Sequence, residues 1–566
     1  MADFAAGEAR FAPSADRPPP GSAAGGAWSQ RLHLRAETLA PALCLILAFA
    51  SITVQGFAFG VDNNLFHIPI VLRWYDLPQF AHDAFIQSLR RYATPVFPAL
   101  SLVSDEGNVR AVFLACHLLT RALTFWGVLR LVASFGLGAL EASAAVTATA
   151  LASIVYGLSR IGHDELLIGI FTHTALAQAA ALWALGWMLR GQPIKATLAA
   201  ALAFDINFMV GAWTLAPLAA IAVSATPRPS LQKFALAAIA FAAAVAPMVG
   251  WTLTSQSWGP VGFDYHAYLA DYYPNHFFIG WAEWPSRISW LLQILAGVGA
   301  AACLPRRRLC AGLALGAFVL LFVAGAAVDQ GSHARLVLNL HLLRSDGLME
   351  WLAVALVTAA AVVSVARGRL LLLPAAIVAL AGLAADSWGL AAAGVWILLL
   401  LRHLPPSAAP TLRLRAAPSR LAAAVTAMAA VGAGFGAYLP GASAVDPAWT
   451  EVTDWARTRT APDAVFLAPW KRDFIVAAER RSWVGWKEGA AAMWAPETYA
   501  AWKRRGDEVK ALHDARAELA YACAHHIDYV VFDRQPAIRL PGVENLTKPV
   551  FDNASFRVAR PTCPGG

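Results

Sequence analysis

The amino-acid sequence predicts a mainly α-helical protein, in which a polytopic membrane bundle of about 11–13 helices precedes a small C-terminal α/β domain. Hydrophobic residues make up 58% of the 566 residues and charged residues only 14%, whereas a soluble protein of this size carries about 25% charged residues. The mean hydropathy is +0.53. The apolar residues are concentrated in blocks of about 18–25 residues, the length that crosses a hydrocarbon core of about 30 Å.

The first 36 residues differ from the rest in composition. Arg17 is followed by three prolines and by a stretch rich in Gly, Ala and Ser, a composition that cannot bury enough apolar surface to fold. We therefore expect residues 1–36 to form a disordered cytoplasmic tail. The first apolar block after this tail is longer than the apolar core of a signal peptide, so it is expected to remain as a membrane anchor.

Residues 37–440 are expected to form the transmembrane domain. Two apolar runs contain an acidic residue, Asp205 and Asp386, where a straight membrane helix would carry a cost of about 2.5–3.5 kcal/mol. Because basic residues also flank both ends of each run, each is interpreted as a hairpin of two short helices, with its tip buried in protein or in a wet cavity. The runs interpreted as spans are 37–59, 109–134, 142–158, 166–189, 196–223, 233–254, 288–304, 309–328, 347–366, 370–401 and 421–440, of which 196–223 and 370–401 are the hairpins.

The basic residues predict the orientation. With the N-terminus in the cytoplasm, most of those near the spans fall on the inner side, as the positive-inside rule requires. Thirteen helices, an odd number, then place the C-terminal domain outside. One proposed inner turn, 131–141, has no basic residue of its own. Anionic lipid head groups would attract much of the net charge of +8, so membrane lipids are expected as partners and no nucleic acid is.

Residues 441–566 are expected to form a soluble extracytoplasmic α/β domain, because strand and helix patterns alternate along them. The expected elements are a helix over 449–459, strands over 463–468 and 482–486, a helix over 496–522, a buried strand over 527–533, and a turn with an edge strand over 551–558. Cys523 and Cys563 both lie on the outer side, where a disulfide could form, but the sequence does not show whether they are close together.

Carboxylates, imidazoles and guanidinium groups recur in the expected outer loops. Such a set suits a phosphorylated lipid substrate: an Arg fork can hold a phosphate, and a carboxylate can act as a general base or help to hold a divalent cation. Aromatic residues crowd the loop 255–289 and suit either an interface belt or a substrate groove. The site candidates are Asp62 and Asp83 as catalytic carboxylates, and Arg90, Arg91, Arg344, His67 and His163 as substrate or phosphate ligands. His82-Asp83 and His163-Asp164-Glu165 look like fragments of metal sites, but adjacent residues cannot easily chelate one ion, so no metal ligands are assigned.

This layout resembles the GT-C class of membrane glycosyltransferases, and also uncharacterised bacterial membrane proteins of the same general design. The similarity rests on an acidic residue directly after the first span, on the number of spans, and on a soluble external domain. It implies a protein of the bacterial plasma (inner) membrane that uses a polyprenyl-phosphate-linked sugar donor. It further implies that Asp62 or Asp83 is the catalytic carboxylate, that Arg344 is a phosphate contact, and that a divalent cation, Mg²⁺ or Mn²⁺, could take part.

Two hypotheses for function remain from the sequence. The first is an enzyme that transfers a sugar from a polyprenyl-phosphate donor to an acceptor at the outer face. The second is a non-enzymatic membrane protein, either a transporter or an envelope assembly partner. Transporters often carry internal repeats and charged residues at mid-membrane, whereas here no internal repeat is evident and most polar residues fall in loops on one side. That asymmetry favours chemistry at the outer surface.

Overall fold

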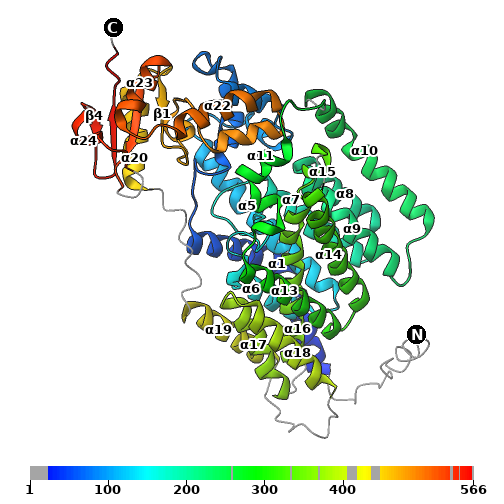
Figure 1. Cartoon of the computed structure of the whole chain (residues 1–566). Helices are drawn as coiled ribbons and strands as arrows, with labels where there is room; N and C mark the ends of the chain where they lie inside the picture. The colour runs from blue at the N-terminus through cyan, green and yellow to red at the C-terminus, as the bar shows by residue number, and fades with distance from the viewer. Residues whose placement is uncertain are drawn as a thin grey trace.

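The structure is a computed structural model that describes residues 23–256, 259–331, 334–366, 370–403, 417–434, 446–535, 539–546 and 548–563. Residues 1–22 of the predicted tail lie outside this description. The first helix, α1 (Ala23–Gln55), begins earlier than the expected start of the membrane domain at residue 37. The helical bundle and the small C-terminal sheet that the sequence predicts are both present (Figure 1).

Thirteen helices form the bundle within the described residues, in agreement with the predicted number. After α1 they are α5 (Val109–Ser134), α6 (Ala139–Ala150), α7 (His173–Leu189), α8 (Pro193–Ile206), α9 (Phe208–Ser224), α10 (Leu231–Ser255), α13 (Trp284–Cys303), α14 (Arg308–Gly331), α16 (Asp346–Ala366), α17 (Leu373–Ala384), α18 (Trp388–Arg402) and α19 (Ala417–Gly434). Helix α16 is buried along nearly its whole length and forms the centre of the bundle.

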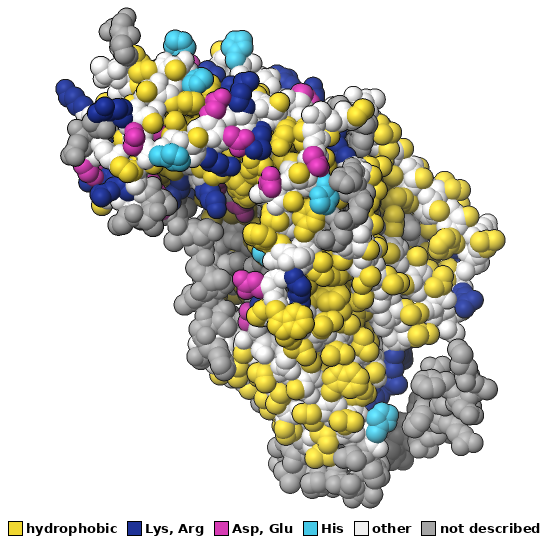
Figure 2. All heavy atoms as spheres, viewed as in Figure 1, with side chains coloured by type: hydrophobic (Ala, Val, Ile, Leu, Met, Phe, Trp, Pro, Cys, Tyr) yellow, Lys and Arg dark blue, Asp and Glu magenta, His cyan; other side chains and the backbone are white. Residues whose placement is uncertain are grey.

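The described helices include five that are long and apolar enough to cross a membrane: 109–134, 231–255, 284–303, 308–328 and the helical stretch 335–366. Figure 2 shows hydrophobic side chains covering most of the visible bundle surface, whereas charged side chains and histidines gather over the C-terminal domain. An apolar lateral surface of this extent is typical of helices that face lipid. The chain is therefore a multi-pass membrane protein.

Both predicted hairpins are present. In the first, α8 ends and α9 begins at Asn207, and α9 packs so closely on α8 that a Cβ on Gly211 would overlap Phe204. In the second, α17 and α18 meet at Asp386, which has a positive φ of 56°, and a Cβ on Gly394 would overlap the backbone of Ala379. Small residues allow membrane helices to approach this closely.

The predicted spans 142–158 and 166–189 are wrong at the ends that face each other, because both helices are shorter there than predicted. Helix α6 stops at Ala150 and α7 starts only at His173, so 151–172 is an irregular and mostly buried segment rather than two helix ends with an exposed turn. Its backbone and side chains find partners inside the protein: Ser153 donates to the Ala384 carbonyl at 2.7 Å, for example. Non-helical backbone is tolerated in a membrane protein where it is buried in this way.

The turn 131–141, which the sequence predicts to be an inner turn, has a basic neighbour from another loop. The Arg306 backbone N–H donates to the Phe135 carbonyl at 3.1 Å, and the Arg306 side chain lies against Gly136. Arg190 reaches the Arg130 carbonyl at 2.9 Å, and Arg402 reaches the Cys303 carbonyl at 2.7 Å. Turns that are far apart in sequence thus share one basic end of the bundle.

The segments between α1 and α5 and between α10 and α13 fold at the opposite end, against the C-terminal domain. They contain α2 (Asn64–Val71), α3 (Ala84–Ser88), α4 (Val96–Leu100), α11 (Tyr265–Tyr272) and α12 (Pro274–Phe277). The aromatic residues of 255–289 pack largely against the C-terminal domain: the Tyr268 hydroxyl donates to the Gly489 carbonyl at 2.7 Å, and Tyr272 packs on Trp502. Much of this aromatic cluster is therefore an internal interface.

The C-terminal domain contains a five-stranded sheet in the order β2-β1-β3-β5-β4. Strands β1, β2 and β3 are parallel, and β5 is antiparallel to both β3 and β4. The strands are β1 (Val465–Leu467), β2 (Arg481–Ser482), β3 (Tyr529–Asp533), β4 (Pro549–Asp552) and β5 (Phe556–Ala559), and the helices are α20 (Pro447–Arg459), α21 (Ile475–Ala478), α22 (Tyr499–Lys510), α23 (Ala515–Ala524) and α24 (Val543–Leu546). A disulfide joins Cys523 to Cys563.

Two expectations for this domain need correction. The predicted helix 496–522 is two helices, because Asp514 caps the start of α23 through the Ala517 N–H at 2.8 Å, and an Asp at that position starts a new helix. The predicted strand 482–486 is only the two-residue β2. Beyond it, the backbone turns so that the Trp486 N–H donates to the Trp470 carbonyl at 2.9 Å.

Candidate functional site

Asp62 lies where the chain leaves α1 and meets the C-terminal domain. Its φ of 53° is left-handed, a conformation that Asp tolerates better than most residues. Its backbone N–H donates to the Asp473 carboxylate at 2.7 Å, and its own carboxylate forms an ion pair with Lys487. The Asp62 side chain is nevertheless 56% exposed. A rigidly held carboxylate therefore faces solvent where the segment between α1 and α5, predicted to be the first outer segment and called so below, meets the C-terminal domain.

A small cavity of about 20 Å³ adjoins this contact, enough for one water molecule. Its lining includes Asp473, Lys487 and Glu488. Burial lowers the pKa of Lys487 to about 7. Burial raises the pKa of Asp473 to about 6 and that of Glu488 to about 8. Each of these groups can therefore change its protonation state close to neutral pH.

Asp83 has a different environment. It is buried, and its carboxylate caps α3 by accepting from the Ile86 N–H at 3.0 Å. Burial raises the Asp83 pKa, against the opposing effect of hydrogen bonds and of Arg481 and Arg505. Its negative charge contributes to the raised pKa of Glu488. Asp62 and Asp83 therefore act on neighbouring residues of one C-terminal segment, but only Asp62 is open to solvent.

A buried polar cluster centred on Arg344 adjoins the segment that contains Asp62. Arg344 belongs to the short 3₁₀ helix η7 (Leu342–Ser345), which precedes α16. Its Nη2 contacts Asp164 Oδ1 at 2.9 Å, with side-chain exposures of 12% for Arg344 and 0% for Asp164. Gln178 donates to the second Asp164 oxygen at 2.5 Å. Burial raises the pKa of Asp164 to about 7, although Arg344 acts to lower it.

The irregular segment 151–172 brings these groups together. Asp346 accepts from the Ser159 hydroxyl at 2.6 Å and from the Gly162 N–H at 3.0 Å. Gly162 packs so tightly on Leu343 and Arg344 that a Cβ would overlap their backbone. The loop thus requires glycine at this position, and that close approach places Asp164 beside Arg344.

Glu165 links the cluster to the Asp62 segment. It accepts from the Asn63 side chain at 2.5 Å and from the Thr172 hydroxyl at 2.5 Å. Burial raises the Glu165 pKa, and Arg344 is the largest opposing influence. Because Asn63 follows Asp62 directly, the exposed carboxylate and the buried guanidinium belong to adjoining parts of one polar network.

Histidines surround Arg344 and are held neutral. Burial and the Arg344 charge lower the pKa values of His163, His276 and His341. His163 contacts the Asn275 amide at 3.1 Å. His67 is stacked on Phe97 with ring centroids 4.0 Å apart, and neither of its ring nitrogens has a partner within the described structure.

The remaining arginine candidates lie elsewhere. Arg90 contacts Asp76 at 2.7 Å and covers the Tyr75 ring, and Arg91 forms an ion pair with Glu497. Both are surface contacts of the first outer segment, so the structure brings His163 close to Arg344 but not these two arginines. Among the described residues, no group of three or more His, Cys, Asp or Glu side chains could hold a metal ion.

The sequence did not point to Asp473, Lys487 or Glu488, which approach the first outer segment from the C-terminal domain. A signal was present: Lys487-Glu488 follows the apolar run Trp483-Val484-Gly485-Trp486, and charges next to such a run are candidates for buried function. A partner for Lys487 could not be chosen from sequence, because Asp62 lies more than 400 residues earlier.

Comparison with known proteins gives one partial family match. The model of a domain of unknown function, DUF6798, matches residues 447–509, a range that contains Asp473 and Lys487. A search of curated proteins found no match.

Solved structures show similarity along most of the chain. The arabinofuranosyltransferase AftD from Mycobacteria matches with a TM-score of 0.45 and 14% identity, over 93% of this chain and 40% of AftD. ArnT from Cupriavidus metallidurans, in a structure bound to undecaprenyl phosphate, matches with a TM-score of 0.43 and 14% identity, over 93% of this chain and 98% of ArnT. This chain thus spans less than half the length of AftD. With TM-scores below 0.5, these matches carry no argument about fold or activity, which must rest on the structure and the site of this chain.

Proposed function

We propose that this protein is a GT-C-like membrane glycosyltransferase that transfers a sugar from a polyprenyl-phosphate donor to an acceptor at the outer face. The observation that carries the proposal is the polar network described above, in which a solvent-exposed carboxylate, Asp62, adjoins a buried cluster around Arg344. In this proposal an acceptor hydroxyl reaches the exposed Asp62 from solvent, and the donor phosphate is held at Arg344.

In the proposed reaction, Asp62 is the general base. The acceptor hydroxyl gives its proton to the Asp62 carboxylate, and the hydroxyl oxygen bonds to the anomeric carbon of the sugar. The bond between that carbon and the donor phosphate oxygen breaks, and polyprenyl phosphate leaves. Lys487 is a positioning residue, because its ion pair with Asp62 holds that side chain in place.

Arg344 is proposed to hold the phosphate. Its Nε has no partner in the described structure, so one donor is available in addition to the nitrogen that contacts Asp164. A phosphate would compete with Asp164 for the guanidinium. The pKa of Asp164 near 7 makes its protonation inexpensive at neutral pH, and protonation would release Arg344 to the bidentate contact that guanidinium groups make with phosphate.

The proposal also includes the orientation of the protein in the membrane. The C-terminal domain and Asp62 would face the extracytoplasmic side of a bacterial plasma membrane, with the N-terminus in the cytoplasm. Two features support this: the Cys523–Cys563 disulfide, since disulfides persist in oxidising compartments, and the basic turns at the opposite end of the bundle. The participation of a divalent cation, Mg²⁺ or Mn²⁺, in the reaction stays a prediction.

The test is donor consumption by membranes that contain the overproduced protein. The donors would be polyprenyl phosphates that carry a labelled pentose, hexose or amino sugar. We expect one of them to be consumed, and Arg344→Lys to weaken its binding, since an ammonium cannot reproduce the bidentate fork. Arg73→Lys, a change at an exposed surface arginine, is the matched control. If the parent consumes none of the donors, the non-enzymatic hypothesis of a transporter or envelope assembly partner replaces this one.

A further inference from the structure

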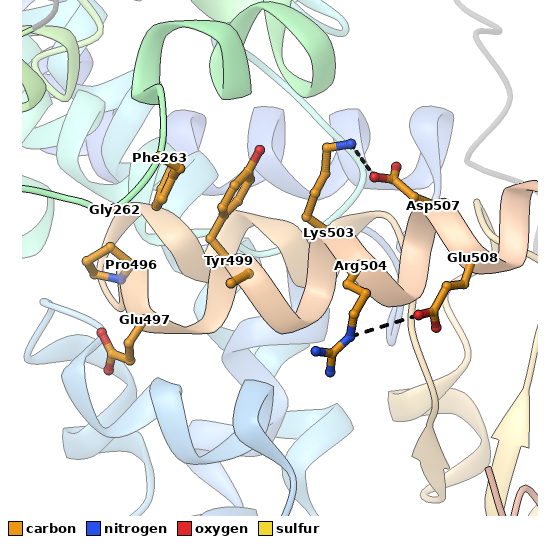
Figure 3. Close-up of a pocket in the computed structure, with 10 residues that line it drawn as sticks. Gly262, Phe263, Pro496, Glu497, Tyr499, Lys503, Arg504, Asp507 and Glu508 are labelled. Atoms are coloured by element: carbon orange, nitrogen blue, oxygen red, sulfur yellow. Dashed lines mark hydrogen bonds and ion pairs between the residues drawn. The ribbon is translucent and has the colours of Figure 1, made fainter.

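A second recess and the small cavity beside Asp62 lie on opposite sides of helix α22. It is an open groove of about 580 Å³, within the range of about 300–1,000 Å³ that is usual for small-molecule pockets. Its walls come from two segments: Gly262 and Phe263 precede α11, and residues 496–508 include α22 (Figure 3). No residue of this groove takes part in the site described above.

The groove has an aromatic floor. Phe263 and Tyr499 stack on each other with ring centroids 3.8 Å apart and planes 20° apart, and Figure 3 shows the two rings side by side at one end of the groove. Both side chains are half-buried. Because the stack covers one face of each ring, it is the remaining exposed apolar surface of the pair that can pack against the C–H groups of a sugar ring.

The charges along the groove are already paired with one another. Lys503 contacts Asp507 at 2.5 Å, and Arg504 contacts Glu508 at 4.0 Å. Glu497, at the other end, is paired with Arg91 of the first outer segment. Each of the three carboxylates in the lining is therefore paired with a cation. Among its described lining residues, the groove offers no unpaired cation to an anionic ligand, whereas sugar hydroxyls can donate to the carboxylates and accept from Lys503.

The position of the groove relates it to the proposed site. Tyr499, Lys503 and Asp507 lie on one face of α22, at four-residue spacing. Trp502 lies on the other face and packs on Trp470, which lines the small cavity beside Asp62. One helix therefore separates the groove from that cavity, a distance on the order of 10 Å.

We propose that this groove binds a neutral oligosaccharide, and that the oligosaccharide belongs to the acceptor of the transfer reaction. The second half of this statement rests on the proposed function. The first half does not, because it is argued from the aromatic floor and the paired charges alone.

Saturation-transfer NMR on the detergent-solubilised full-length protein tests the proposal. The probes are three neutral tetrasaccharides, a glucan, a mannan and an arabinan, with a sulfated tetrasaccharide as the anionic comparison. We expect saturation transfer to at least one neutral probe and none to the sulfated one. No transfer to any neutral probe, or stronger transfer to the sulfated probe, would overturn the proposal.

Two variants locate the binding. Tyr499→Ala removes half of the aromatic floor, and Ala500→Trp fills the groove from an exposed position without removing a contact. Each should reduce the signal at least five-fold. Trp281→Ala, which removes a 64% exposed aromatic outside the groove, should leave it unchanged. If Ala500→Trp leaves the signal intact, the sugar binds elsewhere and the assignment fails.

A further variant separates this proposal from the catalytic one. Asp62→Asn should bind the tetrasaccharide as the parent does while losing transfer. Binding in a protein that consumes no donor would leave the groove assignment standing and remove its link to catalysis.

Discussion

The Asp164→Asn variant should change how stability depends on pH. Asp164 has no exposed side-chain surface, and its folded-state pKa is about 7 against an ordinary value of 3.8. The folded protein therefore binds this proton more tightly than the unfolded chain does. Stability from this group is fully present below about pH 4, falls as the pH rises, and is lost above about pH 7. The pKa difference corresponds to roughly 4 kcal/mol.

Asparagine cannot ionise, so the variant should lack this loss. The stability of Asp164→Asn relative to the parent should rise by roughly 3 kcal/mol between pH 4.5 and 8, because part of the full difference already lies below pH 4.5. With an unfolding entropy of about 2.1 cal/mol/K per residue, a chain of 566 residues that unfolds as one unit would shift its Tm by about 3 °C.

The assay is thermal unfolding in detergent at a single scan rate across this pH range. Using the difference between variant and parent removes the contributions of other groups with raised pKa values, such as Glu488 and Asp473. A flat difference for Asp164→Asn would mean that Asp164 has an ordinary pKa and that the Arg344 cluster is open to water, which would refute the reasoning.

Three further predictions concern the fold. Gly394→Val should overpack the α17–α18 hairpin and lower the free energy of unfolding by at least about 1–3 kcal/mol, measured as a lower Tm or a lower yield. Gly389→Ala should be tolerated, because its added Cβ would meet its nearest neighbour at an ordinary 3.7 Å. Equal behaviour of the two variants would argue against the hairpin packing. Cys523→Ser removes a disulfide that spans 40 residues and should lower the free energy of unfolding by about 2–4 kcal/mol. The measurement is a decrease in Tm, which a reducing agent should reproduce in the parent. An unchanged Tm would show that the bond is not formed. Reporter fusions after Arg415 and after Gly566 should report opposite sides of the membrane, and the same side for both would contradict the odd helix number.

Much of the bundle could be predicted because membrane insertion imposes strong local rules. Asp205 and Asp386 marked the two hairpins, since a charged group at mid-membrane is expensive. The same rules failed for 142–158 and 166–189. Apolar composition could not show that the chain between them is buried and irregular, because its stability depends on partners distant in sequence, such as Ala384 for Ser153.

The site was less accessible to sequence reasoning. Asp62 and Arg344 were singled out from their positions, but the carboxylate that meets Arg344 is Asp164, 180 residues away. Asp164 and Glu165 looked like loop residues or fragments of a metal site, whereas their hydrogen bonds to Gln178 and Asn63 make them buried parts of one network. Asp83 could not be separated from Asp62 until the structure showed that it caps α3.

Turnover by Asp62→Asn, with Asp83→Asn alongside it, tests the central claim most directly. Asparagine keeps the shape of Asp62 and removes its charge, and it is also a good helix cap at position 83. With a donor that the parent consumes, and at equal membrane expression, Asp62→Asn should lower turnover by about 10²-fold or more, the scale of lost acid–base catalysis, while Asp83→Asn retains most of it. Parent-like turnover by Asp62→Asn, or a comparable loss confined to Asp83→Asn, would contradict the assignment of Asp62 as the base.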